Sequence, residues 1–471
     1  MAVLATPGFD LQPSAEQVAL ASNYITNFDF LNQYLPDTYE KEFERYGNRT
    51  VASFLRLVGA EMPSNSDLIK WAEQGRLHTK YTNVNANTAL PATAGTFLVN
   101  DANVTGIAIR VGQTVLIVDN ATGNSNKGLV TAVVAGGTGV GNFTVSYYET
   151  AGTIAQNQTC TVMVYGSEFG KGTNGMQGSL EAEDVFFDNK PIIIKDKYTV
   201  SGSDMAQIGW VEVSTENGAT GYLWYLKSEH ETRLRFDDYL EMAMVEAIPA
   251  AAGSGVAALG TPVAAAQGEL GNRGTEGLFY VLENRGNVFS GTPAALSDFD
   301  AIIQRLDKQG AIQENAMFLN RATSFAIDDI LAAQNSYGAG GTSYGLFDND
   351  EEMALNLGFS GFKRGYEFYK TDWKYLNDAT LRGGIVGGAI NGVIVPAGST
   401  SVYDQVMGKN AKRPFLHVRY RASEAEDRRF KTWITGSAGG AATSDLDAME
   451  VNFLSERCLC TMGANNFFLM K

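Results

Sequence analysis

The sequence predicts an α+β protein with a small β-sandwich or barrel inserted into it. Three observations predict this fold class. Residues 222–247 can form a helix of about seven turns without Gly or Pro. Helix and strand patterns alternate in the C-terminal half, and 83–165 is β-rich and poor in Lys and Arg. The 471 residues are enough for two or three cores, so the insertion can have a core of its own.

The composition predicts a folded, acidic protein. Hydrophobic residues make up 44% of the chain and charged residues 19%, which argues against disorder. The net charge of −16 argues against a general nucleic-acid binder, because binding to phosphates needs clustered Lys and Arg. An acidic wall that repels packed DNA would still suit a container.

The number of cysteines and the lengths of the apolar runs indicate the cellular compartment that we expect for the protein. Cys160, Cys458 and Cys460 are few and odd in number, which predicts a reducing environment. The N-terminus lacks the basic and apolar regions of a signal peptide. No apolar run reaches the ~20 residues of a membrane-spanning helix.

The N-terminal 82 residues divide into an arm (1–50) and the start of the body (51–82). The arm has no core pattern of its own, although Ser14 can cap a helix over 15–35. We therefore expect the arm to lie on another surface. Residues 48–58 predict a capped helix whose buried positions are Val51, Phe54, Leu55 and Val58.

The inserted domain is predicted over 83–165. Its strands alternate in polarity and are separated by Gly and Asn turns. We expect them at 107–111, 114–118, 128–134, 143–148 and 159–165.

Residues 166–215 predict a long two-stranded hairpin built from 185–187, 192–197 and 208–213. A hairpin alone in water is marginally stable, so its apolar side chains need a partner. We predict that they contact a neighbouring subunit. This candidate assembly interface consists of Phe186, Phe187, Ile192, Ile194 and Trp210.

The rest of the chain is predicted as three regions. Residues 216–295 contain the long helix over 222–247, and 296–400 form an α/β domain. This α/β domain contains helices at 297–306 and 322–333 and a buried strand at 317–319. Residues 401–471 close the fold with strands at 414–420, 430–434 and 449–469.

No set of residues predicts catalysis, a cofactor or a metal site. The histidines His78, His230 and His417 lack metal-ligand spacing, and Cys458 and Cys460 are interpreted as buried thiols. The stretch from Gly341 to Gly345 matches the G-x-S-x-G of a nucleophile elbow. Loop sequence surrounds it where a strand and a helix are required, so we interpret the match as chance.

Two stretches and the order of elements resemble a known fold. MFLNRATSFAIDDIL (317–331) looks like a strand, Asn turn and helix of the Hong Kong 97 capsid fold, and FLSERCLCTMGANNFFL (453–469) looks like its closing strand. Tailed-phage major capsid proteins and encapsulins share this fold. Residues 42–50 and 73–78 are similar to crAss-like and related podovirus capsid proteins. Gly463 and Ala464 stand where the family often has Pro.

The resemblance assigns a role to each region. It implies an N-arm (1–50), the start of the P-domain and the base of the E-loop (51–82), and an E-loop (166–215). The spine helix at 222–247 would lie in a P-domain region over 216–295, followed by an A-domain (296–400) and closing P-domain strands (401–471).

The resemblance also implies a structural protein and not an enzyme. Hexamers and pentamers of the chain would form the icosahedral head of a phage around double-stranded DNA, without sequence-specific DNA binding. Portal, scaffolding and possible decoration or head-fibre proteins would be its partners. The protein would be assembled in the host cytoplasm and located in the virion. Lys190, Lys195 and Lys197 lie where the family sometimes crosslinks, but no motif supports a crosslink, so we expect non-covalent assembly.

Three alternatives remain at this point. A tail-tube protein would be shorter than this chain and would not need the seven-turn helix over 222–247. An encapsulin-like cargo shell would have the same fold, but encapsulins in general lack an insertion such as 83–165. A phage tail enzyme or adhesin would belong to another class, and it tends to show β-solenoid repeats, which this sequence lacks.

Overall fold

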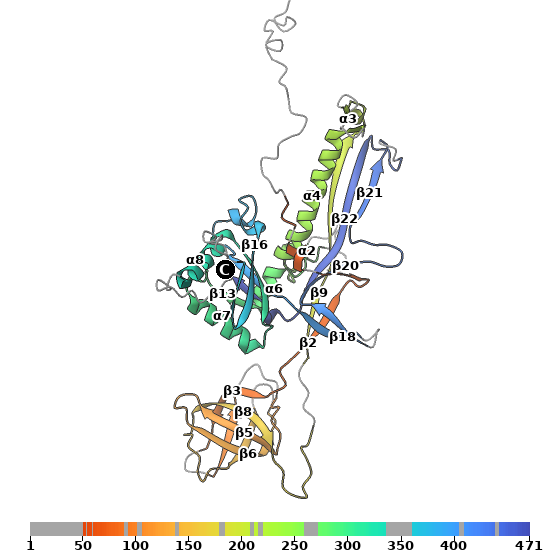
Figure 1. Ribbon diagram of the computed structural model, residues 1–471. Helices are drawn as coiled ribbons and strands as arrows, with labels where there is room; N and C mark the ends of the chain where they lie inside the picture. The colour runs from red at the N-terminus through yellow and green to blue at the C-terminus, as the bar shows by residue number, and fades with distance from the viewer. Residues whose placement is uncertain are drawn as a thin grey trace, which may run out of the picture. The chain divides into compact units, whose positions relative to one another are not determined.

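The computed structural model describes residues 50–471 with gaps at 53, 59, 89–92, 101–105, 137–140, 179–183, 208–211, 215–219, 259–271, 336–359, 405–408 and 439–441 (Figure 1). The predictions for the arm at 1–49, for Trp210 and for the motif at Gly341–Gly345 lie outside the described residues. Where the structure describes the chain, no helix has both the length and the apolar character needed to cross a membrane.

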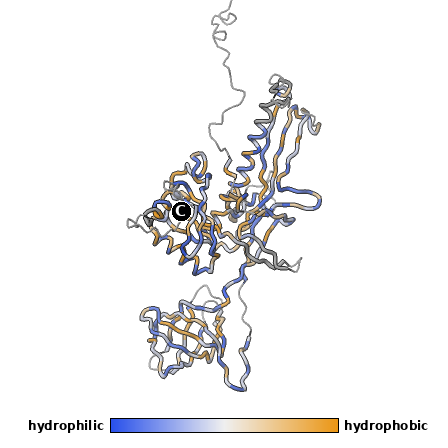
Figure 2. The backbone as a smooth tube through the Cα atoms, viewed as in Figure 1, coloured by the Kyte–Doolittle hydropathy of each residue, from blue (hydrophilic) through white to orange (hydrophobic). Residues whose placement is uncertain are grey.

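The long helix α4 (Leu223–Glu246) confirms the helix predicted over 222–247. It lies along a five-stranded sheet, and Figure 2 shows hydrophobic and hydrophilic residues mixed along its length. Phe236 and Leu240 of α4 form a buried cluster with Met449, Val451 and Phe453 of the sheet. The sheet has the order β1 (Ala60–Ser64), β20 (Leu416–Arg421), β22 (Ala448–Thr461) and β10 (Ile192–Ser201), and β21 (Lys431–Gly436) also pairs with β22.

A six-stranded mixed sheet forms the C-terminal α/β part. Its order is β13 (Asn287–Phe289), β23 (Phe468–Met470), β17 (Gly392–Pro396), β14 (Glu314–Leu319), β16 (Tyr366–Asp372) and β15 (Gly361–Arg364). Phe299, Ile302 and Leu306 of α7 (Leu296–Gln309) and Ile327 of α8 (Arg321–Asn335) lie in the core of this part. The strand predicted at 317–319 and the helix predicted at 322–333 are therefore confirmed as parts of β14 and α8.

Shorter elements complete the fold. The helices are α2 (Phe54–Val58), α3 (Gly202–Gln207), α5 (Gly255–Ala258) and α6 (Leu278–Arg285), and the short strands are β11 (Glu212–Ser214), β12 (Thr220–Tyr222), β18 (Ser399–Asp404) and β19 (Lys409–Pro414). Helix α2 is shorter than the helix predicted over 48–58. Its predicted core residues Val51, Phe54 and Leu55 are buried. The carboxylate of Asp238 in α4 accepts hydrogen bonds from the backbone N–H groups of Val51 and Ala52, which holds the start of the described chain on α4.

The β-rich stretch forms a closed six-stranded barrel, one of the two forms that the sequence predicted. The strand order is β3 (Lys80–Ala86), β4 (Ala94–Val99), β7 (Gly141–Tyr147), β6 (Ser125–Val134), β5 (Gln113–Asp119) and β8 (Thr159–Ser167). Val84, Ile117, Phe143, Val145 and Val162 fill a core that is separate from the other cores. The strand predicted at 107–111 is wrong: Ile107 and Ile109 are buried, but their backbone joins no ladder. Strands β3 and β4 were not predicted.

The hairpin predicted within 166–215 is also wrong in its pairing. Strand β9 (Asp184–Asn189) pairs with β2 (Ile69–Gln74), and β10 pairs over ten residues with β22. The reason is that β22 offers a long buried partner strand, and Ile192 and Ile194 of β10 pack against the cores beside it. We call the five-stranded sheet, the six-stranded sheet and their helices the body. The barrel is therefore connected to the body through the antiparallel β2–β9 ribbon.

Candidate functional site

The β2–β9 ribbon has two unlike faces. The inner face carries Trp71 and Glu73 of β2 opposite Phe187 and Val185 of β9. The outer face carries Lys70, Ala72 and Gln74 opposite Asp188, Phe186 and Asp184, and all six of these residues are exposed. The alternation follows from the strand period of two.

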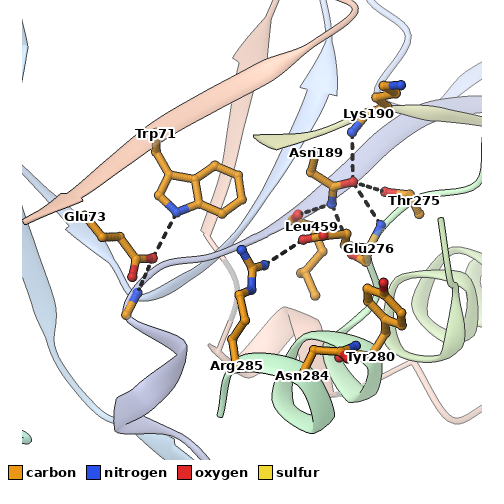
Figure 3. Close-up of polar contacts among 11 residues, drawn as sticks. Trp71, Glu73, Asn189, Lys190, Thr275, Glu276, Tyr280, Asn284, Arg285 and Leu459 are labelled. Atoms are coloured by element: carbon orange, nitrogen blue, oxygen red, sulfur yellow. Dashed lines mark hydrogen bonds and ion pairs between the residues drawn. The ribbon is translucent and has the colours of Figure 1, made fainter. Parts of the chain in front are cut away.

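Asn189 fixes the point at which β9 ends and β10 begins (Figure 3). Its Oδ1 accepts hydrogen bonds from the backbone N–H of Lys190, the hydroxyl of Thr275 and the backbone N–H of Glu276, at 2.8–2.9 Å. Its Nδ2 donates to the carbonyls of Glu276 (3.0 Å) and Leu459 (2.6 Å). A buried amide with both donors and its acceptor used holds three chain segments together.

Glu73 fixes the other strand of the ribbon. Its Oε1 accepts a hydrogen bond from the backbone N–H of Gly463 (2.8 Å) and one from the indole N–H of Trp71 (3.1 Å), as Figure 3 shows. Gly463 has a φ of 60°, a left-handed conformation that suits glycine. The inner face of β2 is therefore tied to the turn that follows β22.

Arg285 of α6 connects the ribbon to the helices. Its Nη2 forms a 2.6 Å ion pair with Glu276, and its guanidinium lies 4.3 Å from the centre of the Phe187 ring. Burial raises the pKa of Glu276, and the Arg285 charge opposes this shift. Phe187 also lies next to Trp71, with 6.3 Å between the ring centroids. Through these contacts, the inner face of the ribbon packs against its own subunit.

The structure separates the predicted interface residues. Phe186 is 71% exposed on the outer face, whereas Phe187 is partly buried against Arg285. Ile192 and Ile194 lie in β10 and pack against cores of their own chain. The assumption that these two side chains find no burial within their own subunit is therefore wrong. Trp210 is outside the described residues. Contact of these residues with a neighbouring copy stays a prediction.

Sequence reasoning missed the residues that anchor the ribbon. The alternation of Ile69, Trp71 and Glu73 with polar or small residues was a signal for β2. No local signal indicated that Asn189 would contact Leu459, because the two are 270 positions apart.

All three cysteines are free and buried, which confirms the interpretation of Cys458 and Cys460 as buried thiols. On β22, Cys460 lies opposite the buried His417 and Cys458 lies opposite Arg419. Hydrogen bonding to Cys460, together with burial, raises the pKa of the Cys458 thiol, so this thiol stays protonated. Across the described part of the chain, no three His, Cys, Asp or Glu side chains gather as a metal site would require.

Comparisons with known proteins give structural similarities only. No family model and no curated protein matches the chain. A solved structure titled "Mycobacterium phage Ogopogo" is similar over 92% of this chain and 96% of that chain, with 9% identity and a TM-score of 0.39. The asymmetric unit of the bacteriophage PhiM1 mature capsid is similar over 92% and 91%, with 8% identity and a TM-score of 0.39. The capsid of a native GTA particle is similar over 97% and 99%, with 10% identity and a TM-score of 0.39. With TM-scores below 0.5, these similarities assign neither a family nor a function to the chain.

Proposed function

We propose that this chain is the major capsid protein of a tailed bacteriophage, with a Hong Kong 97-like fold. It is a structural subunit that assembles as hexamers and pentamers into an icosahedral head around double-stranded DNA. The observation that carries the proposal is that the chain extends two-stranded ribbons that belong to no larger sheet.

Three such ribbons occur among the described residues: β2–β9, β11–β12 and β18–β19. A two-stranded ribbon is marginally stable in water unless a further surface covers it. In β2–β9 the body covers the inner face at Trp71, Glu73 and Phe187, whereas Val185 on that face and Phe186 on the outer face stand exposed. A neighbouring copy that lies on this face would bury the Phe186 ring and complete the ribbon. Repeated around a closed lattice, such contacts add up to a stable shell.

The body supplies the rigid part that a shell subunit needs. Phe236 of α4 contacts Phe430 edge-to-face and stacks on Phe453, with centroids 5.3 and 5.8 Å apart. This aromatic cluster fixes α4 to the sheet, which supports its role as the spine helix of a P-domain. Strands β14 to β17 of the six-stranded sheet, with α7 and α8, suit the A-domain over 296–400, and β13 and β23 join this sheet from outside these bounds.

The pairing of β2 with β9 changes the proposed E-loop. We assign the E-loop to the β2–β9 ribbon, which carries the barrel between its strands, and no longer to a hairpin within 166–215. The other boundaries stay as proposals: an N-arm over 1–50 and closing P-domain strands over 401–471. Portal, scaffolding and decoration or head-fibre proteins are the proposed partners, and the virion is the proposed location of the protein.

Electron microscopy of the purified chain tests the proposal. We expect closed icosahedral particles, and Phe186→Ser should lower their yield at least tenfold while the monomer stays folded. Phe325→Ser, at another exposed phenylalanine on α8, is the matched control and should leave the yield within about twofold. A protein that stays monomeric under all assembly conditions would contradict the proposal.

Two further properties of the particles test the proposal: whether they contain DNA, and whether their subunits are covalently linked. Particles from infected cells should contain double-stranded DNA, whereas a protein cargo without DNA would indicate an encapsulin-like shell. Denatured particles should run as a single band on a gel. A ladder of multiples would contradict non-covalent assembly.

A further inference from the structure

An open groove lies on the wall of the barrel, outside the ribbon and its anchor. Thr114 of β5, Lys127 of β6 and the end of β8 line it, together with Tyr148, Glu149 and Glu168. Its volume of about 660 Å³ lies within the ~300–1,000 Å³ that is usual for small-molecule sites. The proposed shell function uses none of these residues.

Two tyrosines line the groove, and a β-bulge directs the side chain of one of them, Tyr165, into it. The register of β5 with β8 shifts between Thr114 and Val115, which pair with Gly166 and Val164, so Tyr165 is the extra residue. Bulges re-aim side chains in this way and are frequent next to functional sites. Tyr165 and Tyr148 are 50% and 52% exposed, so both rings offer an aromatic surface to a ligand.

Two carboxylates stand beside the tyrosines, and both are held in place. Both oxygens of Glu149 accept from the backbone N–H of Lys127, at 3.0 and 3.2 Å. The hydroxyl of Tyr148 donates to Glu168, and this hydrogen bond raises the pKa of Tyr148 to about 12. An ionised carboxylate has about four acceptor positions, so each retains acceptors for a ligand.

The floor of the groove contains a buried hydroxyl that lacks a hydrogen bond. Thr114 is 5% exposed, and its Oγ1 has no hydrogen-bond partner among the described residues. A Cβ at position 166 would stand 3.1 Å from this oxygen and would meet nothing else within 4 Å. Because residue 166 is glycine, no side chain from this position covers the hydroxyl. Buried polar groups normally have partners, so this hydroxyl points to a missing hydrogen-bonding partner.

Charge favours an uncharged ligand. Over 80–168 the three cations Lys80, Arg110 and Lys127 stand against the four anions Asp101, Asp119, Glu149 and Glu168, a net charge of −1, although the whole chain carries −16. Lys127 also lies in the groove beside the two glutamates. The groove therefore lacks both the clustered cations that phosphates require and a strong negative field for a basic peptide.

We propose that this groove binds a neutral oligosaccharide. A sugar ring presents an apolar face of C–H groups, which packs against an aromatic ring, and a rim of hydroxyls, which donate to carboxylates. Tyr148 and Tyr165 contact the ring faces, and Glu149 and Glu168 accept from the hydroxyls. Neutral sugar chains are thus the class of partner that this barrel recognises, independently of shell assembly.

Isothermal titration calorimetry of the full-length chain with maltohexaose, cellohexaose and chitohexaose tests the proposal. We expect saturable binding of at least one of these sugars. Tyr165→Ala should weaken that binding at least tenfold by removing a ring, and Glu168→Gln should weaken it about threefold or more by removing a charged acceptor.

Val134→Ala is the control, because Val134 is equally exposed on the same barrel but does not line the groove. It should bind within twofold of the parent, and unchanged circular dichroism should show that every variant is folded. Three outcomes would each overturn the proposal: no binding of any sugar, equal binding by Tyr165→Ala and the parent, or tighter binding of tetra-arginine than of every sugar.

Discussion

The side-chain amide of Asn189 donates a 2.6 Å hydrogen bond to the carbonyl of Leu459. This bond joins the last residue of β9 to β22, the strand with which β10 pairs. The chain therefore leaves the ribbon and enters the sheet at a point that a single buried amide determines.

Replacement of this amide should destabilise the body. In Asn189→Ala the buried carbonyl of Leu459 and the N–H of Glu276 lose their partner, so we expect a loss of about 2–4 kcal/mol in the free energy of unfolding. Urea denaturation measures this loss. Asn284→Ala removes an exposed hydrogen bond to Tyr280 and should cost less than ~0.5 kcal/mol. Equal stability of the two variants would contradict the role of Asn189.

The barrel should be removable. Gln74 and Asp184 are the last paired residues of the ribbon on the barrel side, so a short turn can replace 75–183. The core of the barrel shares no residue with the other cores, and the body should stay folded. Scanning calorimetry should show one unfolding transition fewer than in the full chain. A shortened chain without a cooperative transition would show that the body needs the barrel.

The packing of α4 against the five-stranded sheet should depend on Phe236. Phe236→Ala leaves a cavity between two aromatic rings, and we expect a loss of about 3–5 kcal/mol in unfolding free energy. Tyr239→Ala, on the exposed side of the same helix, controls for helix propensity and should cost less than ~1 kcal/mol. Chemical denaturation followed by far-UV circular dichroism measures both. A loss below 1 kcal/mol in Phe236→Ala would mean that α4 is held elsewhere.

The barrel should lose stability in acid through Asp119. The hydroxyl of Thr122 (2.6 Å) and the backbone N–H of Ala121 (2.9 Å) donate to its carboxylate and lower its pKa from 3.8. A lowered pKa in the folded state means that the added stability is complete above pH 3.8 and is lost as the pH falls through the lowered pKa.

Thermal unfolding of the barrel between pH 6 and pH 2 measures this effect. Asp119→Asn cannot titrate at this position, so its melting temperature should fall less than that of the parent over the same range. Parallel curves for the two proteins would rule out Asp119 as a source of the pH dependence.

The thiols should be unreactive in the native state. Cys160, Cys458 and Cys460 are buried, so a reagent in water cannot reach them. Burial also raises the pKa of Cys160 to about 11. Hydrogen bonds with Cys458 and His417 lower the pKa of Cys460, so the protection of this thiol rests on its exposure of only 1%. Ellman's reagent should modify none of them in buffer and all three in guanidinium chloride. Leu77→Cys, at a position that is 86% exposed, should react at once and verifies the assay. Rapid modification of the native parent protein would show that the body opens.

Much of the fold could be predicted because its signals are local. The absence of Gly and Pro over 222–247 predicted α4, and the sequence from Met317 to Leu331 predicted a strand followed by a helix. The turn-rich, weakly charged stretch at 83–165 predicted a separate β domain, and the structure shows a closed barrel there. Helix periodicity and turn residues act over a few positions, so a single sequence reveals them.

The candidate site could be predicted only in part. Phe186 was identified because an apolar residue in a strand with little core is conspicuous, and it is exposed. Ile192 and Ile194 belong to the same apolar pattern, yet they pack beneath α4 within their own chain. The pattern shows that a side chain needs burial. It does not show whether the same chain or a second copy buries it.

By itself, the sequence determined the long helix α4, the strand and helix from Met317 to Leu331, and the inserted β domain. Only the tertiary structure decided that β9 pairs with β2, that β10 pairs with β22, and that Asn189 connects the two. Ile192 lies opposite Arg457, 265 positions away. Strand pairing depends on which distant backbone can satisfy the N–H and C=O groups while burying the correct face, and no local pattern encodes that choice.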